Sequence, residues 1–486
     1  MNTWIFLTLM LCSIKPTTAA NVTDKLDTER NQTETGGLLG TEHPVTQLPV
    51  TEYPDVTSGA PMPGEAPVTG TGASPVDSPG PELLHPVVAV PGCRRAGAPA
   101  GLQLLGDAIS KFGLDLFKEI LQETSKPNVI ISPLSIVLGL AQLSLGAVNE
   151  TQKQIEQSLH LLSLNCSHYT LCSSIESFRK SILTVASAIY VQKGIHINPD
   201  FIKDSMRFYS SEPQLLTGIN SKDTKAINSW VQEKTGGKIK TFFNQLPSNI
   251  ILLLLNAIHF KGLWQVQFDP LATSNDVFYK EDGNSVQVAM MQHPKYPLSS
   301  FHDDDLQIEV ARLSFKQNMS FIVVKPMGNW KLDNIVPKLN ITDLLARIFK
   351  ARPMPVKIPK LNINFDVELN QALKKLGLGK LFLNPDLRRI SPMPLVVSSM
   401  QHKAMMELKE EGVQAAASTG IAINRSFMKC TINRPFFFII RDDISGIPIF
   451  LGTIKDPKPQ LQTGTHEKLV VNLEKMRNVE TVINPK

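Results

Sequence analysis

Two hydrophobic periodicities alternate along the chain between about residues 104 and 457. In some stretches apolar residues recur every three or four positions, a spacing that places them on one face of a helix. These stretches predict helices at 105–122, 129–146, 151–162, 223–235 and 369–376. Alternating or continuous apolar residues instead predict strands at 183–191, 252–260, 319–325, 357–364 and 395–408.

The most apolar of these strands is 252–260, which reads LLLLNAIHF. Because nearly all of its side chains are apolar, both of its faces must be covered, which predicts a strand near the middle of a sheet. A large, mostly antiparallel mixed sheet covered by helices fits this mixture of elements. We therefore expect an α+β fold.

The segments on either side of this body differ in composition. Residues 4–14 are apolar and are followed by Thr18-Ala19-Ala20, which is typical of a secretory signal peptide over 1–20. Residues 21–103 are rich in Pro, Thr, Ser and Gly, which predicts a disordered extension, either a glycosylated stalk or a plain linker. The body spans 104–457, and 458–486 form a lysine-bearing tail. We expect a secreted, extracellular protein.

Charge, sequons and cysteines add further expectations. A net charge of +5 over 486 residues is mild, so neither nucleic acid nor a membrane is an expected partner. Four cysteines follow the signal peptide, Cys93, Cys166, Cys172 and Cys430, and their three full pairings stay open from sequence alone. Asn-x-Ser/Thr triplets in a secreted chain predict glycosylation. The predicted sites are Asn21, Asn31, Asn149, Asn165, Asn318 and Asn340.

The sequence carries no recognisable catalytic or metal motif. It has no GxSxG, HExxH, GxGxxG or GxxxxGK[ST] pattern, and its cysteines lack metal-ligand spacing. Residues 302–305, HDDD, could hold a cation but fit an acidic surface turn better. A polyanion could bind the basic group of Arg347, Lys350, Arg352, Lys357 and Lys360, although an ordinary charged strand explains these residues better. We expect no cofactor and no metal. From these residues alone, an enzyme whose catalytic residues are scattered along the sequence stays open.

Residues 407–435, ELKEEGVQAAASTGIAINRSFMKCTINRP, leave two interpretations open. Glu, Gln and Ala favour a helix. Against a helix, the stretch has no apolar stripe, and Gly412, Gly420, Ile421 and Ile423 interrupt it. The local residues therefore permit either a weak helix or an exposed loop.

The sequence after this stretch resembles the C-terminal signature of the serpin family. It reads INRPFFFII at 432–440 and GIPIFLG at 446–452, and the resemblance covers roughly residues 104–457. It implies the serpin fold, with a large central sheet, further sheets, about nine covering helices and an exposed reactive loop. It also implies an inhibitor and not an enzyme. In that family the loop is bait for a serine protease, and the molecule is expected to be a monomer.

The resemblance assigns a role to several residues. The hinge at the start of the loop would comprise Glu410, Glu411, Gly412, Val413, Ala415, Ala416, Ala417 and Ser418. The buried "shutter" under the opening sheet and the tryptophan above it would be Ser132, Ser135, Asn256, His402 and Trp264. The bond offered to the protease would be Arg425–Ser426, since arginine suits the acidic pocket of trypsin-like enzymes. The sequon at Asn424 overlaps this bond and is expected to be unmodified.

Plasmin is the favoured target, because the body and the lysine-bearing tail resemble plasmin-inhibiting members of the family. This resemblance implies a role in fibrinolysis, a Cys93–Cys166 disulfide, and contact between plasmin or plasminogen kringles and Lys468, Lys475 and Lys486 of the tail. Two alternatives stay open. One is a regulator of complement and contact proteases, and the other is a non-inhibitory carrier or chaperone.

Overall fold

The computed structural model describes residues 99–458, except 163, 165, 180–182, 349 and 414–428. The predicted signal peptide, the extension as far as residue 98, most of the reactive loop and nearly all of the tail therefore lie outside the described residues.

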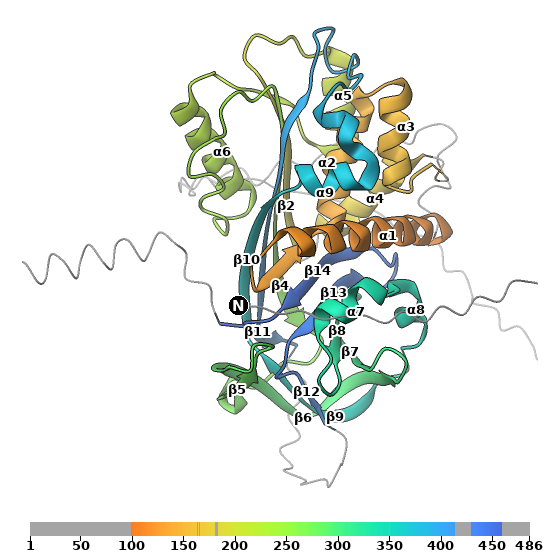
Figure 1. Cartoon of the computed structure of the whole chain (residues 1–486), viewed down its shortest axis with the longest axis vertical. Coiled ribbons are helices and arrows are strands. Elements are labelled where there is room, and N and C mark those ends of the chain that lie inside the picture. The colour runs from red at the N-terminus through yellow and green to blue at the C-terminus, as the bar shows by residue number, and fades with distance from the viewer. Residues whose placement is uncertain are drawn as a thin grey trace, which may run out of the picture. The chain divides into compact units, whose positions relative to one another are not determined.

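A five-stranded sheet, here called the central sheet, runs along the long axis of Figure 1. Its order is β10 (Leu361–Glu368), β11 (Val397–Gly412), β4 (Leu252–Trp264), β2 (Leu183–Val191) and β3 (Gln214–Leu215). The predicted central position of 252–260 is confirmed, since β4 is the middle strand and its first nine residues are all buried. β4 and β11 are parallel, whereas β10–β11 and β2–β4 are antiparallel.

A second sheet lies at the other end of the described part, the lower end in Figure 1. Its strand order is β1 (Asn128–Ile131), β14 (Pro448–Ile454), β13 (Phe436–Asp442), β8 (Met319–Pro326), β7 (Ile308–Ser314), β6 (Ser285–Asp303), β9 (Arg352–Pro359) and β12 (Cys430–Thr431), with β5 (Ser274–Tyr279) paired to β6. The apolar run 436–440 is fully buried as β13, so the signature forms the core of this sheet.

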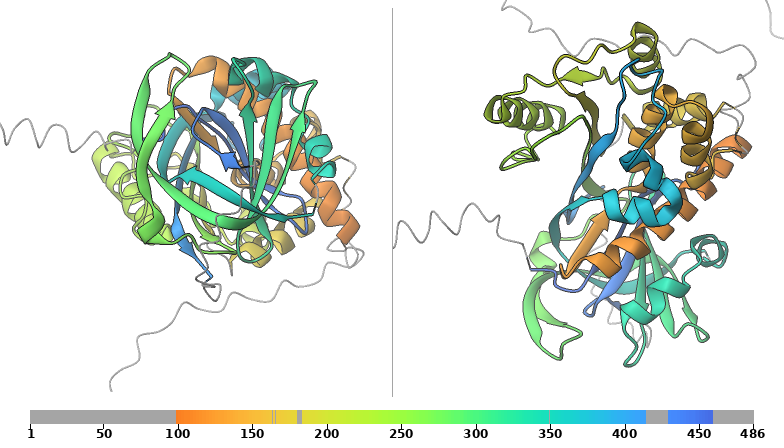
Figure 2. Two further views of the ribbon diagram at one scale, coloured as in Figure 1. Left: turned by 90° about the horizontal axis from the view of Figure 1, so that it is seen from below. Right: turned by 45° about the horizontal axis from the view of Figure 1, so that its top comes forward.

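Nine α-helices cover the sheets in the described part of the chain. They are α1 (Pro99–Glu123), α2 (Pro133–Gly146), α3 (Asn149–Ser158), α4 (Ser167–Arg179), α5 (Pro199–Tyr209), α6 (Asn220–Lys234), α7 (Leu332–Ile335), α8 (Ile341–Ala346) and α9 (Asn370–Leu373). Figure 2 shows α6 on one side of the central sheet and the larger group of helices on the other. All of α2 except Leu145 is buried, and this helix packs beneath β2 and β4.

Several predicted boundaries were wrong. Residues 128–131 form strand β1, because three buried β-branched side chains pair with β14 and Pro133 opens α2 just afterwards. The predicted strand 357–364 is two strands in different sheets, separated at Lys360. The helix predicted at 151–162 ends at Ser158, and the one at 369–376 gives way to a π-turn in which Gly377 has a positive φ of 87°. α4, α5 and strands β5, β6, β7, β13 and β14 had not been predicted.

Candidate functional site

Four buried polar residues form one hydrogen-bonded cluster under the central sheet. Asn256 on β4 and His402 on β11 lie directly opposite each other, and His402 Nδ1 is 2.8 Å from Asn256 Oδ1. Ser135 Oγ donates to the same oxygen at 2.6 Å, and Asn256 Nδ2 donates to the carbonyl of Ser135 at 2.6 Å. The N–H of Ser132 donates to His402 Nε2 at 3.1 Å. The four residues that the resemblance grouped as a shutter are therefore in mutual contact.

This geometry fixes the protonation state of His402. Its Nε2 accepts a hydrogen bond from a backbone N–H, so the ring proton must lie on Nδ1 and point to Asn256. Burial lowers the pKa of His402 to about 3, because a charged imidazolium would be desolvated there. The ring is consequently neutral at physiological pH. It joins β4 to β11 beside the start of α2, the helix that Ser132 caps.

Trp264 marks the far end of the seam between β4 and β11. Its Nε1 donates to the carbonyl of Lys409 at 2.6 Å, and its ring stacks on Phe315 with a centroid distance of 4.6 Å. Its own carbonyl accepts from the N–H of Val413 at 3.1 Å, and the carbonyl of Val413 accepts from Gln267. The backbone that leads into the reactive loop is therefore held by Trp264 and the residues just after it.

The acidic pair of the predicted hinge has two different environments. Glu410 is buried and accepts from Thr273 Oγ1 at 2.7 Å and from Lys360 Nζ at 2.9 Å. Burial raises the pKa of Glu410, but the hydrogen bonds from Lys360 and Thr273 outweigh it and leave the pKa below its usual value. Glu411 lies nearer the solvent and pairs with Lys261 at 2.5 Å. Of these two carboxylates, only Glu410 is buried and needs its partners to offset the cost of burying its charge.

A further buried carboxylate on the same seam was not predicted. Glu407 on β11 is 6% exposed, and its Oε1 lies 3.1 Å from Nε2 of His259 on β4. Lys238 and Lys409 also contact Glu407, at 3.4 Å and 3.0 Å. Two features of the sequence could have indicated this contact. One is an acidic residue, Glu407, within the predicted strand 395–408, and the other is a histidine, His259, within the most apolar strand.

The remaining predicted residues divide between the two parts of the chain. Arg425, Ser426, residues 415–418, Cys93, Asn21, Asn31, Asn165 and the tail lysines lie outside the described residues. Asn149, Asn318 and Asn340 are exposed, and Asn340 Oδ1 caps α8 by accepting from the N–H of Asp343. Cys166 is disulfide-bonded, whereas Cys172 and Cys430 are buried thiols, so the predicted Cys93–Cys166 pairing stays a prediction.

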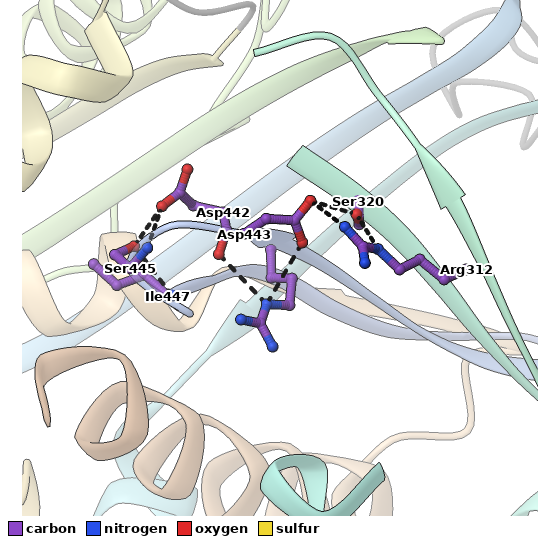
Figure 3. Close-up of polar contacts among 7 residues, drawn as sticks. Arg312, Ser320, Asp442, Asp443, Ser445 and Ile447 are labelled. Carbon is purple, nitrogen blue, oxygen red and sulfur yellow. Dashed lines mark hydrogen bonds and ion pairs between the residues drawn. The ribbon is translucent and has the colours of Figure 1, made fainter. Parts of the chain in front are cut away.

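A charged network on the second sheet, away from the seam, is structural. Figure 3 shows Asp443 accepting from Arg312 Nη2 at 2.8 Å and from Ser320 Oγ at 2.6 Å, while Asp442 accepts from the N–H and Oγ of Ser445. These contacts tie the β13–β14 turn to β7 and β8.

Carboxylates within the described residues neutralise most of the predicted basic group. Arg347 pairs with Asp303, Lys357 with Asp276, and Lys360 with Glu410. Asp303, from the 302–305 turn, is buried against Arg347 and also accepts from the N–H of Leu306. Within the described residues no group of three or more His, Cys, Asp or Glu could hold a metal ion.

Known proteins match both the sequence and the fold. The family model described as Serpin (serine protease inhibitor) matches residues 107–457. Mouse α2-antiplasmin is 40% identical over 76% of this chain and 75% of its own length, and the bovine protein is 38% identical over 79% of each. The similarity to α2-antiplasmin confirms the predicted resemblance to serpins of this kind.

More distant relatives agree with the family. Mouse plasma protease C1 inhibitor is 30% identical over 73% of this chain and 71% of its own length. The crystal structure of mouse protein-Z dependent protease inhibitor is 27% identical, with a TM-score of 0.67 over 74% of this chain and 99% of that one. Its fold and the family match over residues 107–457 show that the chain belongs to the serpin family, a family of serine protease inhibitors and not of enzymes.

Proposed function

We propose that this protein is a secreted inhibitor of trypsin-like serine proteases, with plasmin the favoured target, and that it thereby regulates fibrinolysis. The protease cleaves Arg425–Ser426, the freed loop enters the central sheet, and the protease stays covalently attached. The observation that carries the proposal is the parallel pairing of β4 with β11, the strand that continues directly into the reactive loop.

Strand geometry explains why this seam can accept the loop. A chain that leaves the end of β11 and turns back runs antiparallel to β11, and therefore also antiparallel to β4. Insertion would replace one parallel ladder with two antiparallel ladders, which are slightly more stable per residue. Serpin loop insertion is itself a known case of strand addition to a sheet, so the principle is borrowed from the family.

The side chains of the loop suit this insertion. In the family's register Val413, Ala415, Ala417 and Thr419 would point into the core, and all four are uncharged and of modest size. Val413 is 41% exposed before cleavage and would become buried. A small-residue hinge of this kind argues against a carrier or chaperone that never inserts its loop.

Arginine before the cleaved bond and the similarity to α2-antiplasmin favour plasmin. In this proposal Lys468, Lys475 and Lys486 of the tail bind plasmin or plasminogen kringles, and the resulting tether raises the local concentration of protease. Regulation of complement and contact proteases is the second candidate. It is favoured by the similarity to C1 inhibitor and by the long Pro- and Thr-rich extension.

Secretion forms part of the proposal. It is supported by the predicted signal peptide, the sequons and the disulfide-bonded Cys166. In the described residues, no helix combines the length and apolarity required to cross a membrane.

The test is to incubate the protein separately with plasmin, a complement protease and kallikrein, followed by denaturing electrophoresis. We expect a complex with plasmin that survives SDS and forms more slowly when a free lysine analogue is present. Arg425→Ala is the control and should form no such complex. Cleavage of the wild-type protein without a stable complex would refute inhibition, and a complex with the other proteases alone would favour the second candidate.

A further inference from the structure

Glu407 is a buried carboxylate whose two oxygens are shared among three partners. Oε1 lies 3.1 Å from His259 Nε2 and 3.4 Å from Lys238 Nζ, and Oε2 lies 3.0 Å from Lys409 Nζ. Glu407 and His259 are 6% and 4% exposed. Burial raises the pKa of Glu407, but hydrogen bonds from Lys409 and His259 outweigh it and lower the pKa to about 2. The group is therefore ionised and strongly held.

The partners of Glu407 come from different parts of the fold. His259 belongs to β4, where it lies opposite Met405 of β11, so its contact with Glu407 runs diagonally across the seam. Lys238 belongs to the connection between α6 and β4. Since strand residues alternate between faces, Glu407 and His259 lie on the opposite face of the sheet from His402 and Asn256. The seam is thus bridged by side chains on both faces.

We infer that the His259–Glu407 contact is a latch that helps to hold β4 against β11 and sets the rate at which the central sheet opens for the reactive loop. This inference rests on the proposed function, because the latch matters only if a strand enters here. Neighbouring strands are about 4.8 Å apart, so an inserted strand would increase the distance between β4 and β11 to about 9.6 Å. A contact of 3.1 Å cannot span that gap, and it must break as the sheet opens.

When the latch breaks, Glu407 loses His259 but keeps at least one of its other partners. Lys409 lies on the same strand two residues away and moves with Glu407 when the seam opens. His259 and Glu407 therefore act as positioning residues: neither touches the bond that is cleaved. They oppose the opening of the sheet, and so they influence whether the cut loop inserts before the protease escapes.

Sheet opening can be measured without a protease. The probe is a free peptide with the sequence of residues 412–425, GVQAAASTGIAINR. Its uptake by the intact protein is followed by native electrophoresis and by the rise in melting temperature. His259→Phe and Glu407→Gln should each take up the peptide about tenfold faster than wild type, which is the lower end of what a hydrogen bond to a charged group contributes.

The double variant separates a latch from general loosening. If the two residues act through their mutual contact, the double variant should be no faster than the faster single variant, because the shared interaction is lost only once. Lys261→Met is the matched control. It breaks the more exposed Lys261–Glu411 pair across the same two strands and should change uptake by less than twofold.

A second readout distinguishes the latch from the proposed function. The number of inhibitor molecules consumed per protease trapped should be unchanged or lower in His259→Phe, since faster insertion favours trapping. Urea unfolding checks that each variant folds. If Glu407→Gln does not fold, the test rests on His259→Phe alone. Wild-type uptake with unchanged rates in folded variants would overturn the latch but leave the inhibitor intact. No uptake by wild type, with no stabilisation on cleavage, would overturn the proposed function and the latch with it.

Discussion

Acid should weaken the folded protein through His402, and the structure gives the sign and the size of the effect. The folded state holds this imidazole neutral with a pKa of about 3, because it is fully buried and accepts the N–H of Ser132. In the unfolded chain its pKa is near 6.5. Protons therefore bind the unfolded state more readily, and the stabilising contribution is present above pH 6.5 and lost as the pH falls toward 3.

The magnitude follows from the difference between the two pKa values. A shift from 6.5 to about 3 corresponds to roughly 5 kcal/mol over the whole pH window. About 2 kcal/mol of this would be lost between pH 8 and pH 5, where only the unfolded state has gained the proton. The assay is urea unfolding of the intact protein at pH 8, 6.5 and 5.

A variant isolates the contribution of His402 from other groups. His168 is half-buried, and desolvation lowers its pKa to about 4, so the wild-type protein has more than one source of acid sensitivity. His402→Gln keeps one donor and one acceptor but does not titrate. We expect the wild type to lose about 2 kcal/mol more than His402→Gln between pH 8 and pH 5. Equal losses in the two proteins would refute the assigned protonation state.

Three other changes test the hinge and the loop. Gly412→Ala should lower the free energy of unfolding in urea by about 1–3 kcal/mol, because its Cβ would lie 2.7 Å from the carbonyl oxygen of Trp264. Gly379→Ala is the control and should not, because its Cβ would lie 3.9 Å from Lys374 Cγ, an ordinary contact. Lys360→Met should lower the free energy of unfolding by about 1–2 kcal/mol at pH 7, because it removes the cation beside buried Glu410. An unchanged urea midpoint would contradict this prediction. Ala415→Glu should convert the inhibitor into a substrate that is cleaved without an SDS-stable complex, whereas outward-facing Ala416→Glu should still trap protease.

The sequence predicted the central strand well because one physical requirement dominates there. A strand with LLLLNAIHF cannot leave either face in water, so β4 had to lie in the middle of a sheet. The stretch 128–146 was harder, because short apolar runs are compatible with either a strand or a helix. Only the pairing of Val129–Ile131 with β14, more than 300 residues later, decides for a strand, and that partner is invisible to local periodicity.

The shutter and the latch likewise depend on contacts between residues far apart in the sequence. Ser132, Ser135, Asn256 and His402 could be grouped only by family resemblance, since local sequence shows each as an isolated polar residue. The contact between His259 and Glu407 joins residues 148 positions apart, and nothing in either neighbourhood indicates the other. Burial and register decide such contacts, and both are properties of the folded sheet.

Buried polar groups on this seam have a physical rationale that apolar residues would not satisfy. Apolar side chains that packed across β4 and β11 would resist separation without preference for geometry, and would gain little when a strand of alanines came between them. Hydrogen bonds hold only at short distance and good angle, so the contacts of His402 and Glu407 keep the seam closed and fail abruptly once it widens. In the proposed mechanism, the free energy lost with these contacts would be regained from the ladder bonds of the inserted strand. The seam is therefore suited to two states, closed or filled, and a half-open sheet would leave several buried polar groups without partners.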